Sequence, residues 1–81
     1  MTTTIDWRGV GQRLRITRGL LGMTQAEAAE TYGVTLRTYR NYEAGGTQRW
    51  PDPAVTFCET TGVPFGWLIF DAGPGIQRVL H

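Results

Sequence analysis

The chain has 81 residues, of which 41% are hydrophobic and 19% are charged, and its formal net charge is +1 at pH 7. We expect one domain, residues 1–81, whose small core leaves no room for a deep catalytic cleft. No apolar run is long enough to span a bilayer and the N-terminus has no signal-peptide pattern, so we expect a cytoplasmic protein without a membrane partner. The single cysteine, Cys58, and the single histidine, His81, give no zinc spacing, so neither a metal nor a cofactor is expected.

The near-neutral charge does not by itself predict an anionic partner such as nucleic acid. All eight basic residues are arginine. This bias is typical of a GC-rich coding genome, although arginine is also the side chain best suited to phosphate and guanine. The positions of the arginines are therefore more informative than their number.

A first helix is predicted from the cap residue Asp6 to about Leu21. Three glycines within it, Gly9, Gly11 and Gly19, each weaken the helix by up to about 1 kcal/mol relative to alanine, so packing must hold it in place. Its inner stripe, at spacings i, i+4, i+7 and i+11, consists of Val10, Leu14, Thr17 and Leu21.

The next segment predicts a helix-turn-helix over residues 24–45. Thr24 and Glu27 fit a capping box at the start of a short helix, and Gly33 suits the left-handed position after its end. Thr35 then caps a further helix that runs to about Ala44. Two short helices joined by a glycine-centred turn define the motif. The inner face of the first of them is expected to consist of Ala26, Ala28, Ala29 and Tyr32.

The second helix of the motif has two different sides. Tyr39 and Tyr42 lie on one side, and an arc of about 140° on the other holds Leu36, Arg37, Arg40 and Asn41. Arginine pairs with guanine, asparagine with adenine, and leucine contacts the thymine methyl group, so this arc suits DNA bases. A solvated helix face is the alternative for such polar residues.

Other polar residues have more than one interpretation. Gln25, at the N-terminus of a helix, is either a phosphate contact or a neutral first-turn residue. Arg49, in the loop after the motif, is expected near a DNA phosphate. Arg18 and Glu43 fall close to the inward sides of their helices, which predicts an ion pair between them. A solvated face is expected for Arg8, Arg13 and Arg15.

Two further helices are predicted downstream. Asp52 is expected to cap a helix over residues 53–61, with Pro53 at its first position, and its buried residues would be Ala54, Phe57, Cys58 and Thr61. A fifth helix begins after Gly62-Val63-Pro64 and ends near Phe70, with Trp67 and Leu68 closing the core. The tail, residues 73–81, has no assigned structure, and its apolar residues suggest a contact with a second subunit: Ile76, Val79 and Leu80.

Taken together, these residues resemble the Cro and lambda-repressor-type (Xre) helix-turn-helix family. The resemblance covers about residues 10–72. It rests on the spacing of Arg18, Gly22 and Gln25, on Gly33-Val34-Thr35 and Tyr42-Glu43-Ala44-Gly45 with Ala29 and Tyr39, and on residues 62–69. Ala28 stands where family members have a larger aliphatic residue, so we expect aromatic side chains to fill the core there: Tyr32, Tyr39 or Tyr42.

The resemblance implies an all-α, five-helix lambda-repressor-like domain that binds double-stranded operator DNA as a homodimer. It implies base contacts from Thr35, Leu36, Arg37, Arg40 and Asn41. It implies phosphate contacts from Gln25, Thr47, Arg49 and the Gly46 amide, and an ion pair between Arg18 and Glu43.

The expected function is therefore sequence-specific transcriptional regulation in a phage or bacterium, more specifically repression at a near-palindromic operator. The alternative is an antitoxin or protein-interaction module that uses the same fold, with weak or secondary DNA binding, in which Leu36, tyrosines and tryptophans meet a protein partner. An enzyme is not expected, because no base lies beside a nucleophile in the pattern.

Overall fold

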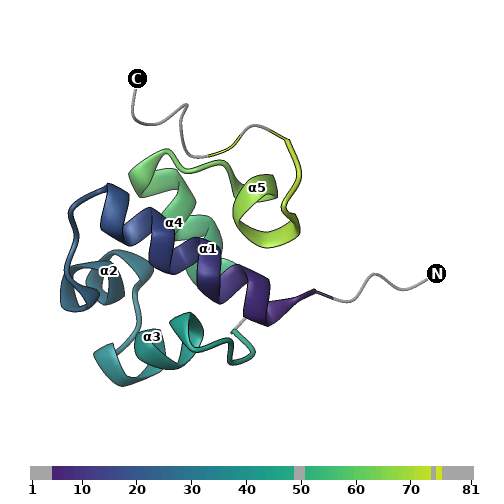
Figure 1. Cartoon of the computed structure of the whole chain (residues 1–81). Coiled ribbons are helices and arrows are strands. Elements are labelled where there is room, and N and C mark those ends of the chain that lie inside the picture. Colours follow the sequence, from purple (N-terminus) through teal and green to yellow (C-terminus); the bar gives the residue numbers. More distant parts are fainter. Residues whose placement is uncertain (1–4, 49–50, 74, 76–81) are drawn as a thin grey trace.

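A computed structural model of the chain describes residues 5–48, 51–73 and 75. In these ranges the chain forms five α-helices and no strand, in the order α1 (Trp7–Leu20), α2 (Gln25–Tyr32), α3 (Leu36–Glu43), α4 (Asp52–Thr61) and α5 (Phe65–Phe70). Helix α1 packs against both α3 and α5, while α2 packs against α3 and α4 (Figure 1). The predicted all-α fold is confirmed. No helix of the described ranges is long and apolar enough to cross a membrane.

Local interactions define both ends of α2 and the start of α3. The Thr24 hydroxyl accepts from the Glu27 N–H at 3.0 Å, and the Glu27 carboxylate accepts from the Thr24 N–H at 2.8 Å, which is the predicted capping box. Gly33 ends α2 with φ of 76°, a conformation that glycine adopts without steric cost. The Thr35 hydroxyl then accepts from the Thr38 N–H at 3.1 Å and caps α3.

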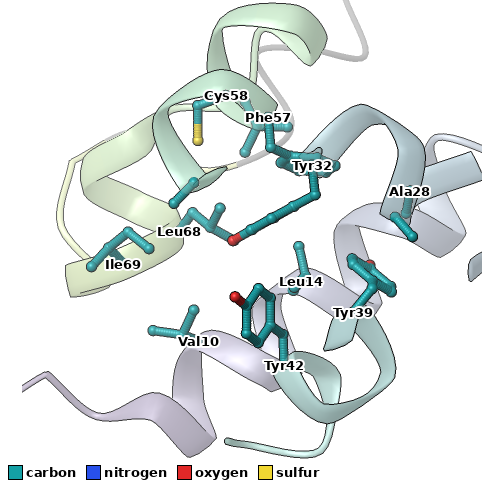
Figure 2. Close-up of a cluster of buried hydrophobic side chains, with 13 residues drawn as sticks. Val10, Leu14, Ala28, Tyr32, Tyr39, Tyr42, Phe57, Cys58, Leu68 and Ile69 are labelled. Atoms are coloured by element: carbon teal, nitrogen blue, oxygen red, sulfur yellow. The ribbon is translucent and has the colours of Figure 1, made fainter. Parts of the chain in front are cut away.

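Aromatic rings fill the core beside the small residues of α2 (Figure 2). Tyr32 lies at the centre of this group: its ring centroid is 5.8 Å from that of Tyr39, 5.6 Å from that of Tyr42 and 5.0 Å from that of Phe57. The inclined ring planes are typical of favourable aromatic pairs. The aromatic side chains therefore occupy the space beside the fully buried Ala28.

Some predicted details are wrong. Ala26 is exposed, because the short α2 directs only Ala28, Ala29 and Tyr32 into the core. Asp52 is the first residue of α4 instead of its cap, since Pro51 occupies the cap position and makes no side-chain hydrogen bond. Three side chains that were expected in the core are only half-buried: Leu21, Thr61 and Trp67.

Arg13 does not belong to a solvated face, contrary to the sequence-based expectation. Its Nε donates to the Leu68 carbonyl at 2.9 Å and its Nη2 to the Ile69 carbonyl at 3.3 Å. The last carbonyls of a helix have no partner within that helix, so a basic side chain from another element can satisfy them. Arg13 therefore fastens the C-terminal end of α5 to α1.

Gly11 allows the closest approach between α1 and α3. A Cβ at this position would lie 2.7 Å from the carbonyl oxygens of Tyr42 and Glu43 and 3.0 Å from the amide nitrogen of Gly45. These neighbours are backbone atoms, which cannot rotate away. The last turn of α3 therefore keeps its place on α1 only while residue 11 has no side chain.

We expect Gly11→Ala to destabilise the protein by about 1–3 kcal/mol, because the added methyl group forces α3 away from α1. Gly19→Ala is the matched control: it lies in the same helix, and a Cβ there would meet no other part of the described chain within 4 Å. At this position alanine should stabilise the protein by about 0.5–1 kcal/mol. Urea unfolding of both variants measures the two changes. Stabilisation by both substitutions would contradict the close contact.

Candidate nucleic-acid interface

Helix α3 has a buried side and an exposed side. Tyr39 and Tyr42 are 0% and 2% exposed, whereas Arg37, Arg40 and Asn41 are exposed. Because residues three or four apart lie on the same face of a helix, the two sets point in different directions. The structure thus separates the residues of α3 that form the core from those that are available to a ligand.

The other two predicted base-contact residues are less open. Leu36 is half-buried, so it is not the freely exposed leucine that the sequence suggested. Thr35 is exposed, but its hydroxyl already accepts from the Thr38 N–H and donates to the Thr38 hydroxyl at 2.9 Å. Both residues lie at the N-terminal end of α3, where Thr35 acts as the cap.

Asn41 packs against the loop that follows α3. A Cβ on Gly46 would collide with the Asn41 side-chain amide, so this amide rests directly on the glycine backbone. A surface depression on the same side is lined by Arg37, Asn41 and Thr47, among others. The structure therefore brings Thr47 next to the exposed side of α3.

Two predicted phosphate contacts of this loop have different outcomes. The Gly46 N–H donates to the Asn41 carbonyl at 2.9 Å, so this amide is not free for a phosphate, contrary to expectation. This hydrogen bond satisfies one of the last carbonyl groups of α3, and it occupies the only donor of the Gly46 backbone. Arg49 lies outside the described residues.

The loop is also anchored by a residue that the sequence analysis missed. Gln48 is only 5% exposed, and its Oε1 accepts from the Tyr32 hydroxyl at 2.6 Å. A glutamine in a polar loop gives no sequence signal of burial, because its partner lies 16 residues away. This hydrogen bond fixes the loop to the aromatic core directly after Thr47.

Arg18 and Glu43 form an ion pair between α1 and the end of α3. The Arg18 Nε donates to Glu43 Oε2 at 2.6 Å and Nη2 donates to Oε1 at 3.3 Å. The side chains are 21% and 6% exposed, respectively. Burial favours the protonated form of Glu43, but hydrogen bonds from Arg18 and Gln25, together with the nearby Tyr39 hydroxyl, outweigh it and lower the pKa of this carboxyl group.

Gln25 is engaged within the protein. Its Nε2 donates to Glu43 Oε1 at 3.2 Å, and its Oε1 accepts from the Arg40 Nε at 3.3 Å. The sequence showed only a polar residue in the first turn of a helix, which is equally typical of a phosphate contact. In the structure Gln25 joins the ion pair to an exposed arginine of α3.

The described part of the chain contains no group of three histidine, cysteine, aspartate or glutamate side chains that could hold a metal ion. The buried Cys58 is surrounded by the core, and burial raises the pKa of its thiol to about 11. A thiol with a raised pKa is a poor nucleophile at neutral pH. The exposed side chains of α3, by contrast, carry N–H donors: Arg37, Arg40 and Asn41.

The family model described as "Helix-turn-helix" matches residues 14–68, which include α2, α3 and α4 and parts of α1 and α5. The chain belongs to the helix-turn-helix family of Cro and lambda-repressor type. Proteins of this family are DNA-binding regulators of transcription.

Curated relatives of this helix-turn-helix protein occur in Sinorhizobium medicae (strain WSM419) and Rhizobium meliloti (strain 1021), and each is named an uncharacterized HTH-type transcriptional regulator. Each is 30% identical over 76 residues, which cover 85% of this chain and 55% of the relative. The chain thus spans about half the length of these relatives. The solved structure of the clp gene regulator ClgR from Corynebacterium glutamicum matches with a TM-score of 0.71 at 21% identity, covering 83% of this chain and 71% of that one. This last similarity shows the fold.

The lowered pKa of Glu43 predicts a loss of stability in acid. Because folding holds the carboxylate ionised below its ordinary pKa of 4.5, its contribution is complete above that pH and is lost as the pH falls through the folded value. We expect Glu43→Gln to lose less free energy of unfolding than wild type between about pH 6 and about pH 3.

The control for this experiment is Glu27→Gln. The backbone hydrogen bond from Thr24 lowers the pKa of Glu27 as well, so this variant removes a separate part of the acid sensitivity. Urea unfolding at both pH values measures all three proteins. If the free energy of unfolding of Glu43→Gln fell as much in acid as that of wild type, the ion pair would not hold the carboxylate ionised.

Proposed function

We propose that this chain is a sequence-specific regulator of transcription that binds duplex DNA through the exposed side of α3. The observation that carries the proposal is the division of this helix. Its tyrosines are buried, while Arg37, Arg40 and Asn41 are exposed together on a helix whose last turn is fixed to α1 by an ion pair. A rigid helix with several exposed donors fits the major groove of B-DNA.

The chemistry of the exposed side matches base edges. Arginine donates two parallel hydrogen bonds to guanine O6 and N7, and asparagine pairs with adenine N6 and N7. Segment 35–41 contains two arginines and no carboxylate, so it attracts DNA although the whole chain is almost neutral. We assign base contacts to Thr35, Leu36, Arg37, Arg40 and Asn41.

The loop after α3 supplies contacts to the DNA backbone. Thr47 is exposed beside Asn41, in a loop that Gln48 anchors to the core. A hydroxyl group in this place suits a phosphate oxygen and adds affinity without sequence preference. Arg49 would add a charged contact to the same strand.

The proposed binding unit is a homodimer on a near-palindromic operator. Helix α3 has eight residues and is therefore about 12 Å long, which is enough for roughly four base pairs. Two copies whose α3 helices are about 34–36 Å apart would contact two half-sites one DNA turn apart. An occupied operator that overlaps a promoter excludes polymerase, so we propose repression, in the cytoplasm, as the outcome.

A protein-binding role is the second candidate, and one observation favours it. Ile16 and Leu20 of α1 and Phe70 of α5 are 53%, 50% and 47% exposed, which offers apolar surface outside α3. The tyrosines Tyr32, Tyr39 and Tyr42 are buried and do not contribute to such a surface. An antitoxin would combine this contact with DNA binding through α3.

The decisive experiment uses a duplex that the protein itself enriches from a random pool, beside the DNA upstream of its gene. We expect Arg37→Ala and Asn41→Ala each to weaken binding by about 1–3 kcal/mol and to relax the preference at one base pair. Fluorescence anisotropy at several salt concentrations measures this. Affinity of the wild type should fall steeply with salt.

Thr60→Ala, on the exposed surface of α4, is the control and should bind like wild type. Wild-type affinity in both α3 variants would refute the assignment of the site. If wild type enriches no duplex from the pool and does not bind the DNA upstream of its gene, the protein-binding role remains as the function.

A further inference from the structure

A continuous chain of hydrogen bonds runs from the interior of the protein to the exposed side of α3. Arg18 on α1 binds Glu43 on α3, Glu43 Oε1 accepts from the Gln25 Nε2 on α2 at 3.2 Å, and Gln25 Oε1 accepts from the Arg40 Nε at 3.3 Å. Exposure increases along it, from the 6% exposed side chain of Glu43 to the exposed Arg40. The hydrogen bonds therefore connect a buried carboxylate to an exposed side chain of α3.

The polarity of this chain of hydrogen bonds is fixed by chemistry. An ionised carboxylate only accepts, so the group of Gln25 that faces Glu43 must be its NH₂. The oxygen of the same amide then faces the other way, toward a guanidinium group that only donates. The lowered pKa of Glu43 keeps it ionised at neutral pH, so Gln25 offers its acceptor to Arg40 throughout the ordinary pH range.

This contact determines which part of Arg40 is free. Because Nε donates to Gln25, a ligand cannot bind the edge of the guanidinium group formed by Nε and Nη2. The end of the group, formed by Nη1 and Nη2, is still available to a ligand. An arginine has many rotamers, and a bond made before binding reduces the entropy that is lost on binding. Gln25 can therefore select one approach direction before a ligand arrives.

We propose that Gln25 is a positioning residue for Arg40, which it directs so that Nη1 and Nη2 meet a guanine edge end-on. The proposal rests on the proposed binding of duplex DNA by α3. It replaces the expectation that Gln25 contacts a phosphate by itself. Gln25 then contributes to sequence preference, at the same base pair as Arg40, instead of adding affinity for every sequence.

The test is a double-mutant cycle between Gln25→Met and Arg40→Ala. Methionine keeps the length of the side chain but removes both hydrogen bonds, and Glu43 retains its two bonds from Arg18. Binding is measured with the enriched duplex and with a set in which each base pair is replaced in turn. Unfolding in urea confirms that each variant is folded.

We expect both single variants to weaken binding to the preferred duplex, Arg40→Ala by about tenfold or more, and both to relax the preference at the same base pair. In the Arg40→Ala background, Gln25→Met should have no further effect. Arg40→Lys should behave like Arg40→Ala, because one ammonium group cannot serve Gln25 and a guanine edge together in the fixed geometry of a guanidinium. Ala26→Ser, an exposed change in the same turn of α2, should bind like wild type.

Two results would overturn the inference. One is a Gln25→Met effect that is equal for all sequences and additive with Arg40→Ala, which is the behaviour of an independent phosphate contact. The other is a Gln25→Met variant that binds every duplex like wild type. If wild type binds and Arg37→Ala relaxes the preference elsewhere, only the role of Gln25 is refuted. If wild type binds no duplex, both the proposed function and the role of Gln25 are refuted.

Discussion

The ion pair between Arg18 and Glu43 fixes the position of α3, on which the proposed site depends. It joins α1 to the final turn of α3 through two hydrogen bonds to a carboxylate that is only 6% exposed. Removal of one partner from a well-buried pair costs about 3–5 kcal/mol, because the other charge stays behind without compensation. Gly11 acts beside it by letting the backbones of α1 and α3 approach. Together these contacts orient the helix whose outer side is free.

The core and the proposed binding site use different residues of α3. Tyr39 and Tyr42 pack with Tyr32 and Phe57 in the core (Figure 2), and Arg37 and Asn41 do not enter it. The arrangement explains how a chain with a net charge of only +1 can suit a polyanion: Arg37 and Arg40 share the exposed side of α3, while the carboxylate of the same helix is neutralised by Arg18. Gln25 of α2 connects the two sets, because it binds both Glu43 and the exposed Arg40.

The sequence was sufficient for features that depend on neighbouring residues. The capping box of Thr24 and Glu27, the left-handed Gly33 and the two sides of α3 follow from short-range rules of geometry, and the structure contains them. The ion pair between Arg18 and Glu43 was also predicted, although the two residues are 25 positions apart, because both fall on the inward sides of their helices. The helix order followed from the spacing of apolar residues.

Other contacts could not be predicted, because they depend on how the helices meet. Arg13 finds its carbonyl partners 55 and 56 residues away, and Gln48 is buried by a tyrosine of α2. The need for a glycine at position 11 likewise follows only from the backbone at the end of α3, which lies against it. A helical pattern marks such residues as polar or small, and only the tertiary structure shows what they contact.

The exposed side of α3 is the surface that we propose to meet DNA. An NMR titration of the ¹⁵N-labelled protein with the enriched duplex tests this contact most directly. We predict the largest shifts of backbone and side-chain signals in segment 35–41 and at Thr47, with small changes in α4. Shifts concentrated instead around Ile16, Leu20 and Phe70, with α3 unaffected, would contradict the account.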